Sequence, residues 1–285
     1  MKFTDSATVV DLENLSAFLS EMNSLPEYHI GYCGTNQEEI YNTIIKDPEL
    51  LKSFIIVKKG EKIISALGYD FYDETIELWG PFIREEYNTE MTTTLWAKML
   101  TKLPKEVKYI LGYCNEKNFK CITWLVDKKF DLSGKHTVLQ IDPQSHKDSA
   151  GFHLLKDEYF KDFVVLHNNL FPNTYYTGMQ ILNKLDDNNA VLVETIDSSL
   201  VGYAFVTQDS LKNGNVEFIG VNPRYQKKGI GYKLMNGALD WFKLKKSREV
   251  ILSVNANNTQ AINLYKKVGF TIKDEMCSYR FKLEK

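Results

Sequence analysis

The fold is decided by the stretch Gln226-Lys227-Lys228-Gly229-Ile230-Gly231. An apolar run at 216–221 precedes it and an amphipathic run at 232–244 follows it, which predicts a strand, a loop and a helix. Glycines let a backbone approach an anion closely, and the N–H groups of a first helical turn point at that anion. Lys227, Lys228 and Lys233 add positive charge around the loop. The stretch therefore indicates a site for a ligand that carries phosphate.

The composition limits the class of protein. The chain has 285 residues, of which 44% are hydrophobic and 25% charged, as in ordinary globular proteins with room for two domains. The net charge of −2 gives no reason to expect nucleic acid or an anionic membrane as a partner. No apolar run reaches the length of a membrane span, and no signal region opens the chain.

The cysteines indicate the redox environment of the protein. The four cysteines are too few and too scattered for a disulfide framework, and they form no zinc-binding pattern with histidine: Cys33, Cys114, Cys121 and Cys277. We therefore expect a reduced, cytoplasmic protein without a metal.

The chain repeats itself at a constant offset of 140 residues. Three pairs of segments share this offset: 77–80 with 217–220, 115–118 with 255–258, and 128–130 with 268–270. Chance matches would not keep one offset, so the two halves are expected to share one fold. The polar stretch 142–148 contains a proline and no apolar periodicity, which is typical of a linker. We predict an N-terminal domain at 1–143 and a C-terminal domain at 150–285.

Each half is predicted to begin with helices, continue with strands and place a helix between its last strands. In the first half, helical spacing falls at 12–22, 40–45 and 95–103, and β-rich runs fall at 54–57, 62–69, 75–82, 109–113 and 138–141. In the second half, helical spacing falls at 160–170, 176–182, 234–242 and 261–268, and β-rich runs fall at 151–155, 190–195, 200–207, 216–221 and 250–254. The residues from 271 onward are expected to form a terminal strand pair.

Three kinds of phosphate-binding loop compete for the stretch 226–231. A P-loop requires Gly-x-x-x-x-Gly-Lys-Ser/Thr, which the chain lacks. A dinucleotide loop requires a third glycine three residues after Gly231, where this chain has Leu234. The third kind is the coenzyme A loop of the GNAT N-acetyltransferases, whose Arg/Gln-x-x-Gly-x-Gly/Ala signature this stretch resembles.

A second block strengthens the resemblance to the GNAT family. The family's pattern Asn-x-x-Ala-x-x-Leu-Tyr-x-x-x-Gly-Phe is matched by Asn258, Ala261, Leu264, Tyr265, Gly269 and Phe270. Two blocks in the right order, roughly 25 residues apart, are more specific than either block alone. The resemblance covers roughly residues 150 to 285. It implies an α/β (α+β) fold of two tandem GNAT-like domains, each a mixed, mostly antiparallel sheet flanked by helices.

The resemblance also implies acetyl-CoA as co-substrate. Its pyrophosphate would bind backbone N–H groups of the loop, its pantetheine arm would run along a strand, and Asn258 would contact it beyond that strand. The expected coenzyme-binding residues are Ile219, Val221, Gln226, Lys227, Lys228, Gly229, Ile230, Gly231, Tyr232, Lys233 and Asn258. The alternative to coenzyme binding is a purely structural role, in which the glycines shape a tight turn and the lysines are surface charges.

Two residues are candidates for the chemistry. By the resemblance, the Tyr265 hydroxyl would lie near the thioester sulfur and act as general acid, whereas its structural alternative is an aromatic side chain packed under the sheet. Glu217, on the strand before the loop, is the candidate general base. A strand glutamate is more often a solvated side chain, and Glu77 recurs at the offset of 140 in the half without the loop, which favours a structural role.

The sequence also offers candidate residues for the acceptor site and shows how the first half differs from the second. The segment 171–176 links the first two helices of the second half, where the family builds its acceptor site, so Phe171, Tyr175 and Tyr176 are candidate acceptor contacts or merely packed aromatics. At the loop position, the first half has 86–91 with two glutamates and no glycine, and Leu125 stands opposite Tyr265. We therefore expect a degenerate N-terminal copy that does not bind coenzyme A well.

These observations predict an acyltransferase, a GNAT-type N-acetyltransferase that moves an acetyl group from acetyl-CoA to a primary amine of a small molecule or peptide by direct attack. A non-catalytic acyl-CoA-binding sensor or scaffold is the alternative. A tandem transferase that uses charged tRNA is a third reading, disfavoured by the neutral charge balance. The sequence leaves open the acceptor, the length of the acyl chain, and whether the protein is a monomer or a homodimer.

Overall fold

The structure is a computed structural model and describes residues 2–4, 6–172 and 174–283. The chain divides into two compact units, which we call unit 1 (residues 1–136 and 274–285) and unit 2 (residues 137–273). The chain passes between the units within two long strands, β6 (Asp131–Ile141) and β11 (Thr271–Lys282). No helix among the described residues combines the length and the apolar character needed to cross a lipid bilayer.

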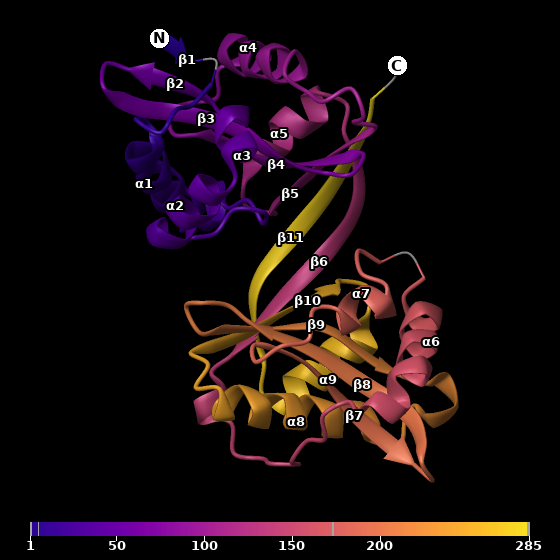
Figure 1. The fold of residues 1–285 in the computed structure, drawn as a ribbon. Helices are drawn as coiled ribbons and strands as arrows, with labels where there is room; N and C mark the ends of the chain where they lie inside the picture. The colour runs from indigo at the N-terminus through magenta and orange to yellow at the C-terminus, as the bar shows by residue number, and fades with distance from the viewer. Residues whose placement is uncertain (1, 5, 173, 284–285) are drawn as a thin grey trace. The chain divides into compact units, whose positions relative to one another are not determined.

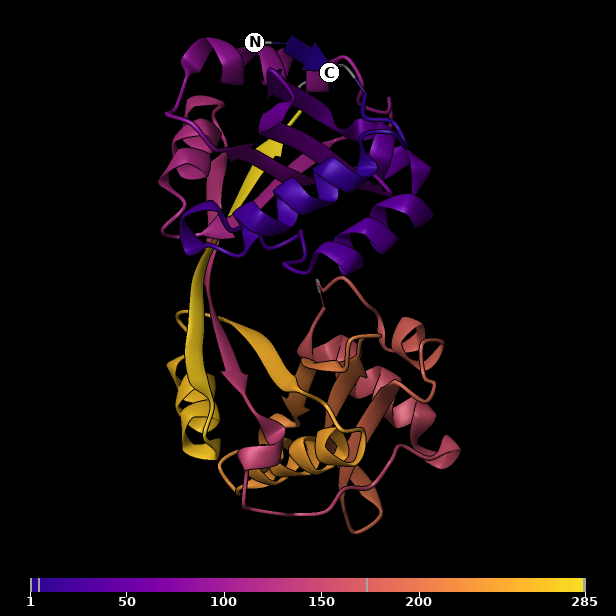
Figure 2. The ribbon, with the colours of Figure 1, turned by 90° about the vertical axis from the view of Figure 1, so that its left-hand side faces the viewer.

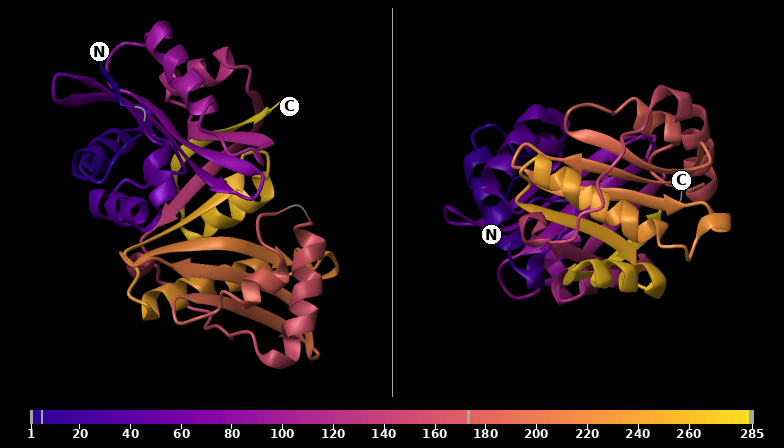
Figure 3. Two further views of the ribbon diagram at one scale, coloured as in Figure 1. Left: turned by 45° about the horizontal axis from the view of Figure 1, so that its top comes forward. Right: turned by 90° about the horizontal axis from the view of Figure 1, so that it is seen from below.

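Unit 1 is a sheet with helices on both faces. Its strands are β1 (Lys2–Thr4), β2 (Ile55–Lys59), β3 (Lys62–Tyr72), β4 (Thr75–Ile83) and β5 (Tyr109–Asn115), in the order β1-β2-β3-β4-β5-β11. Its helices are α1 (Leu12–Asn23), α2 (Gln37–Lys46), α3 (Pro48–Ser53), α4 (Thr89–Leu100) and α5 (Phe119–Asp127), with a 3₁₀ turn, η1 (Pro26–Tyr28). Helices α1 and α2 pack side by side (Figure 2). They share one face of the sheet with α3, and α4 and α5 cover the other face (Figures 1 and 3).

Unit 2 has the same layers. Its strands β7 (Asn189–Ile196), β8 (Ser199–Gln208), β9 (Asn213–Val221) and β10 (Glu249–Asn255) follow the order β6-β10-β9-β8-β7. Its helices are α6 (Phe160–Leu170), α7 (Gly178–Leu182), α8 (Ile230–Leu244) and α9 (Thr259–Val268). Three 3₁₀ turns complete it: η2 (Pro143–Ser145), η3 (Asp157–Tyr159) and η4 (Pro223–Tyr225).

Strand alternation divides the core of unit 2 into two layers. Tyr203 and Phe205 of β8 pack with residues of α6 and α7. Val206 of the same strand points to the other face and packs with residues of α8 and α9. Because both faces are covered, β8 is buried along nearly its whole length. The predicted α/β (α+β) fold, with mixed and mostly antiparallel sheets flanked by helices, is confirmed. Each unit contains a parallel strand pair, β4 with β5 in unit 1 and β9 with β10 in unit 2.

The repeat is visible in small features of the backbone. At the offset of 140, β5 corresponds to β10 and α5 begins where α9 begins. Asn118 and Asn258 cap these two helices, each accepting an N–H three residues ahead at 3.1 Å. Asn115 and Asn255 each accept the N–H two residues ahead, at 3.0 and 2.9 Å. The matching residues of the sequence are therefore the ones that form the same turns twice.

The domain boundaries differ from the predicted 1–143 and 150–285. By the offset, β6 and β11 are equivalent last strands, yet β11 pairs with β5, for example Cys277 with Cys114, and β6 neighbours β10. Residues 274–282 therefore belong to unit 1 and residues 137–141 to unit 2. A strand pattern shows that a residue run pairs, but not which of two similar neighbours it pairs with, and this explains the error.

Three local expectations also differ. Residues 151–155 hold only an isolated bridge from Leu154 to Leu192, and the residues from 271 onward form one strand rather than a pair. The linker 142–148 is docked in unit 2, because His146 is 9% exposed and its Nε2 lies 2.7 Å from Asn236 Oδ1. Helix α5, which the periodicity did not single out, begins at the cap Asn118.

Candidate functional site

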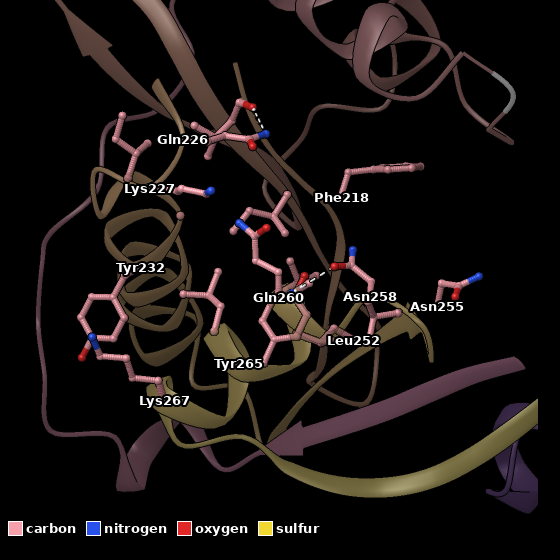
Figure 4. A pocket seen from close by; sticks show the side chains of 18 of the residues that line it. Phe218, Gln226, Lys227, Tyr232, Leu252, Asn255, Asn258, Gln260, Tyr265 and Lys267 are labelled. Atoms are coloured by element: carbon pink, nitrogen blue, oxygen red, sulfur yellow. Dashed lines mark hydrogen bonds between the residues drawn. The ribbon is translucent and has the colours of Figure 1, made fainter. Parts of the chain in front are cut away.

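Unit 2 contains a cleft between its two parallel strands. Strands β9 and β10 are paired at 213–215 with 249–251, and beyond this point they diverge. The diverging ends, the loop before α8 and one face of α9 enclose a cavity of about 660 Å³, which we call the first cavity (Figure 4). The stretch 226–231 thus borders a cavity that reaches from a helix N-terminus to the middle of a sheet.

Strand β9 offers backbone donors to this cavity. Asn222 N–H donates to the Val201 carbonyl across the β8–β9 pair at 2.9 Å. Because N–H groups alternate sides along an extended strand, those of Ile219 and Val221 point away from β8. Both residues line the first cavity. The Gln226 amide donates to the Val221 carbonyl at 3.1 Å and ties the loop to the strand.

The N-terminus of α8 has no cap. Its N-cap residue, Gly229, has φ of 82° and no side chain, and the first helical bond runs from Lys233 N–H to Gly229 O at 3.0 Å. The N–H groups of 230–232 therefore have no acceptor among the described residues. Gly229 is required for its left-handed φ, since a Cβ there would meet nothing within 4 Å. Space at Gly231 is tight, since a Cβ there would lie 3.2 Å from Leu264 Cδ2.

The lysines of the stretch divide into two groups. Lys227 lines the first cavity, and so does Lys267, whose ammonium lies 5.1 Å from the ring centre of Tyr232. Lys228 does not line it, because its ammonium lies over the Tyr225 ring at 5.0 Å. Lys233 does not line it either, because its ammonium pairs with Glu194 at 2.7 Å. Of the predicted coenzyme contacts, the structure therefore does not bring the side chains of Lys228 and Lys233 to the cavity.

The other predicted coenzyme-binding residues all line the first cavity: Ile219, Val221, Gln226, Lys227, Gly229, Ile230, Gly231, Tyr232 and Asn258. Asn258 has a second role, because its Oδ1 caps α9 at the Ala261 N–H. Its amide nitrogen is therefore the part of the side chain left for a ligand.

Tyr265 lies on α9 and lines the first cavity (Figure 4). Its side chain is 6% exposed, and its hydroxyl has no hydrogen-bond partner among the described residues. Burial raises the pKa of Tyr265 to about 12. The phenol is therefore a neutral donor at ordinary pH, with its hydroxyl not engaged by the protein.

Glu217 lies at an irregularity of β9, where the register against β8 shifts. Its Oε2 accepts the Tyr175 hydroxyl at 2.6 Å, and its Oε1 accepts Asn215 Nδ2 at 2.8 Å and Thr207 Oγ1 at 3.2 Å. Three donors from β8, β9 and the loop after α6 thus fix its carboxylate. Glu217 lines the first cavity and also a second one of about 450 Å³.

The three aromatic residues of the predicted acceptor segment surround Glu217 and its strand. Phe171 lines the first cavity and Tyr176 lines the second. The Tyr175 ring packs on Phe218 at 5.0 Å, and burial together with the Glu217 carboxylate raises the pKa of Tyr175. Asn173, in the middle of the segment, lies outside the described residues.

Sequence reasoning missed the β10 side of the cavity and part of α9. The missed lining residues include Leu252, Ser253, Val254, Asn255, Gln260, Leu264 and Lys267. The available signal was the order of the strands: once β10 is placed beside β9, the residues that end it must face the divergence. On α9, Gln260, Leu264 and Lys267 share a helix face with Ala261 and Tyr265 of the motif.

Comparison with known proteins relates unit 2 to a family. Residues 152–270, within unit 2, match the acetyltransferase (GNAT) family. A mycothiol acetyltransferase of Corynebacterium glutamicum is 32% identical over 80 residues, which are 28% of this chain and 27% of that protein. An N-alpha-acetyltransferase of Sulfurisphaera tokodaii is 36% identical over 108 residues, which are 34% of this chain and 64% of that protein. The chain thus spans about a quarter of the first relative.

The fold of the whole chain also has a counterpart. A GCN5-related N-acetyltransferase from Sphaerobacter thermophilus has a TM-score of 0.74 and 15% identity, and the match covers 98% of this chain and 95% of that one. This likeness extends over both units and shows a shared fold. The predicted resemblance to the GNAT family is confirmed for the segment that contains the glycine loop and Tyr265.

Proposed function

Because residues 152–270 match the GNAT family, we propose that the protein is an N-acetyltransferase that moves an acetyl group from acetyl-CoA to a primary amine. The observation that carries the proposal is the combination of uncapped N–H groups at α8 with the Tyr265 hydroxyl in one cavity. The first of these binds phosphate, and the second can serve a leaving thiol. The names of the relatives support acetyl transfer but differ in acceptor.

The residues present fit the donor substrate. Coenzyme A carries a pyrophosphate, and the N–H groups of 230–232 with the positive end of the α8 dipole favour such a group. The ammonium groups of Lys227 and Lys267 add cationic partners at the same cavity. The N–H groups of Ile219 and Val221 suit the amide carbonyls of an extended arm that lies along β9.

Acetyl transfer forms a C–N bond and breaks a C–S bond. A neutral amine attacks the thioester carbon, so that a C–N bond forms, the C–S bond breaks, and the thiol leaves. An N–H group of β9 that faces the cavity stabilises the negative charge that develops on the carbonyl oxygen. Glu217 accepts the proton that the amine releases, directly or through water.

Tyr265 serves the leaving sulfur. With a pKa of about 12, its hydroxyl keeps its proton throughout the physiological range. An ordinary thiol has a pKa of ~8.5, so complete transfer of the proton to a free thiolate is uphill by about 5 kcal/mol. The hydroxyl therefore acts first as a hydrogen-bond donor while the C–S bond breaks, and it gives up its proton late.

The test is thiol release from acetyl-CoA across a panel of amines, amino acids, polyamines, aminoglycosides and peptides. We expect at least one acceptor to support turnover, and Tyr265→Phe to lower kcat roughly 100-fold with unchanged donor affinity. Tyr279→Phe is the matched control, because Tyr279 is equally buried, at 7% exposed, with its pKa raised to about 12, and it lies in unit 1. Donor binding without turnover of any acceptor would favour the sensor or scaffold instead.

A further inference from the structure

The second cavity of unit 2 carries an inference about the acceptor, and it rests on the proposed function. This cavity of about 450 Å³ is enclosed by β7, β8, β9 and the loop between α7 and β7. It lies on the face of the sheet that α6 and α7 cover, since Phe205 and Tyr176 of its lining belong to that core layer. Glu217 belongs to the lining of both cavities, so a ligand of the second cavity meets the first at this carboxylate.

A cation without an acidic partner lines the same cavity. The ammonium of Lys184 lies 4.5 Å from the ring centre of Tyr176, which holds it in place while leaving its charge uncompensated. No carboxylate of the described residues pairs with it. Asp186, two residues further along, also lines the cavity, and its Oδ1 accepts Asn188 N–H at 2.7 Å and Asn189 Nδ2 at 2.8 Å, which fixes this carboxylate in its own turn.

The lining therefore presents one ammonium, two carboxylates and two amides to a ligand, and Lys184 is its one cation among the described residues. Glu217 supplies a carboxylate fixed by three donors, Lys184 supplies the unpaired ammonium, and Asn183 and Asn189 supply neutral hydrogen-bonding groups. A polyamine would place positive charge beside Lys184, and an uncharged amine would leave that ammonium without a partner. A molecule with an amine and a carboxylate complements both ends.

We propose that the second cavity is the acceptor site and that it selects a small amine bearing a carboxylate, such as an amino acid or a short peptide. Its amine lies at Glu217, where it faces the thioester across the shared wall, and its carboxylate lies at Lys184. The reaction forms an amide and a free thiol. The proton of the amine passes to Glu217, and the thiol sulfur takes its proton from Tyr265.

The experiment compares acceptors that differ only in the carboxylate. Each amino acid of a panel is assayed beside its methyl ester and its decarboxylated amine. We expect the free acid to have the higher kcat/KM by roughly tenfold or more, with the difference carried by KM, because one charge-assisted contact is gained. Lys184→Glu should abolish this preference. Lys161→Glu makes the same charge change on an exposed lysine of α6 outside both cavities, and it should leave the preference intact.

A binding measurement separates this inference from the proposed function. The same acceptor pairs are titrated into isotope-labelled protein with coenzyme A present, and the backbone amide shifts of 183–189 are followed. Chemical-shift changes that require both the ligand's carboxylate and Lys184 support the acceptor site. If they occur without acetyl transfer, the acceptor site stands and only the proposed transferase function is contradicted. Equal affinity for acid and ester, no binding of either, or an unchanged preference in Lys184→Glu would overturn the acceptor assignment and leave the donor site untouched.

Discussion

Helices α4 and α8 hold equivalent places in two copies of one fold, and their N-termini differ in the group that caps them. Asn88 caps α4, because its side chain accepts the Met91 N–H at 2.8 Å. Gly229 at α8 has no side chain to do this, so the N–H groups that follow stay open to the cavity. The fold of a duplicated unit and its anion site therefore depend on different residues.

The space beyond the parallel strands differs as well. In unit 2, Gln260 lines the first cavity. At the offset of 140, unit 1 has Lys120, whose ammonium donates to the carbonyls of Glu85 at 2.6 Å and Ile83 at 3.2 Å. Leu125, which stands at the position of Tyr265, is fully buried. Lys120 and Leu125 thus take up, within unit 1 itself, the two positions whose counterparts Gln260 and Tyr265 line the first cavity of unit 2.

The largest expected effect comes from breaking the loop of unit 2. Gly229→Val forces a β-branched residue into a left-handed conformation, which costs about 1–2 kcal/mol and displaces the open N–H groups. We expect acetyl-CoA to bind roughly 10- to 100-fold more weakly by calorimetry. Gly60→Val is the matched control, because Gly60 in unit 1 also has a positive φ, 62°, and open space at its Cβ. Equal donor affinity in both variants would contradict the loop assignment.

The pH dependence of stability sharpens the comparison between Tyr265 and Leu125. The folded pKa of Tyr265, about 12, exceeds the ordinary value of ~10, so its contribution is fully present below pH ~10 and is lost as pH rises to about 12. In that window it lowers the free energy of unfolding by about 1.4 kcal/mol per pH unit. Denaturant titrations should show a shallower alkaline decline for Tyr265→Phe, whereas an identical slope would show that the buried phenol is not the cause.

Removing Lys120, which binds the carbonyls of 83–85 in unit 1, should lower the stability of the protein but not its activity. Lys120→Ala leaves the carbonyls of 83–85 without their donor, at a cost of about 1–2 kcal/mol by denaturant unfolding. Gln260→Ala makes the equivalent change in unit 2, where the residue lines the cavity, and it should weaken donor binding instead. A loss of donor binding in Lys120→Ala would mean that unit 1 takes part in the site.

The smallest effect is expected at the cap of α4. Asn88→Ala should lower the free energy of unfolding by about 1 kcal/mol, the usual value of an N-cap. Asn36→Ala, at the equally capped α2, is the control and should lose a similar amount. Neither change should create a second donor site, because Lys120 still occupies the carbonyls beyond β4.

The features that the sequence predicts correctly are those that depend on residues close together in the chain. The strand, the glycine turn and the start of α8 follow from residues adjacent in sequence, and Tyr265 follows from its motif. The positions of the Lys228 and Lys233 side chains do not follow from the local sequence. Their contacts with Tyr225 and Glu194 form only in the folded chain. The network around Glu217 joins three elements, and no pattern along the sequence connects Tyr175 to Asn215.

The predicted domain boundaries differ from the two observed units for a related reason. Two copies of one sequence pattern offer β6 and β11 equivalent partners, and the choice between β5 and β10 depends on the whole fold. The offset of 140 gave the correspondence of the elements, whereas the pairing required the structure.

Hydrogen–deuterium exchange at the two helix N-termini tests the central claim most directly. Amide exchange is measured at 230–232 of α8 and at 89–91 of α4, with and without acetyl-CoA. We expect acetyl-CoA to slow amide exchange at 230–232 of α8 and to leave exchange at 89–91 of α4 unchanged. Protection at α4, or its absence at α8 under conditions where acetyl-CoA binds, would contradict this claim.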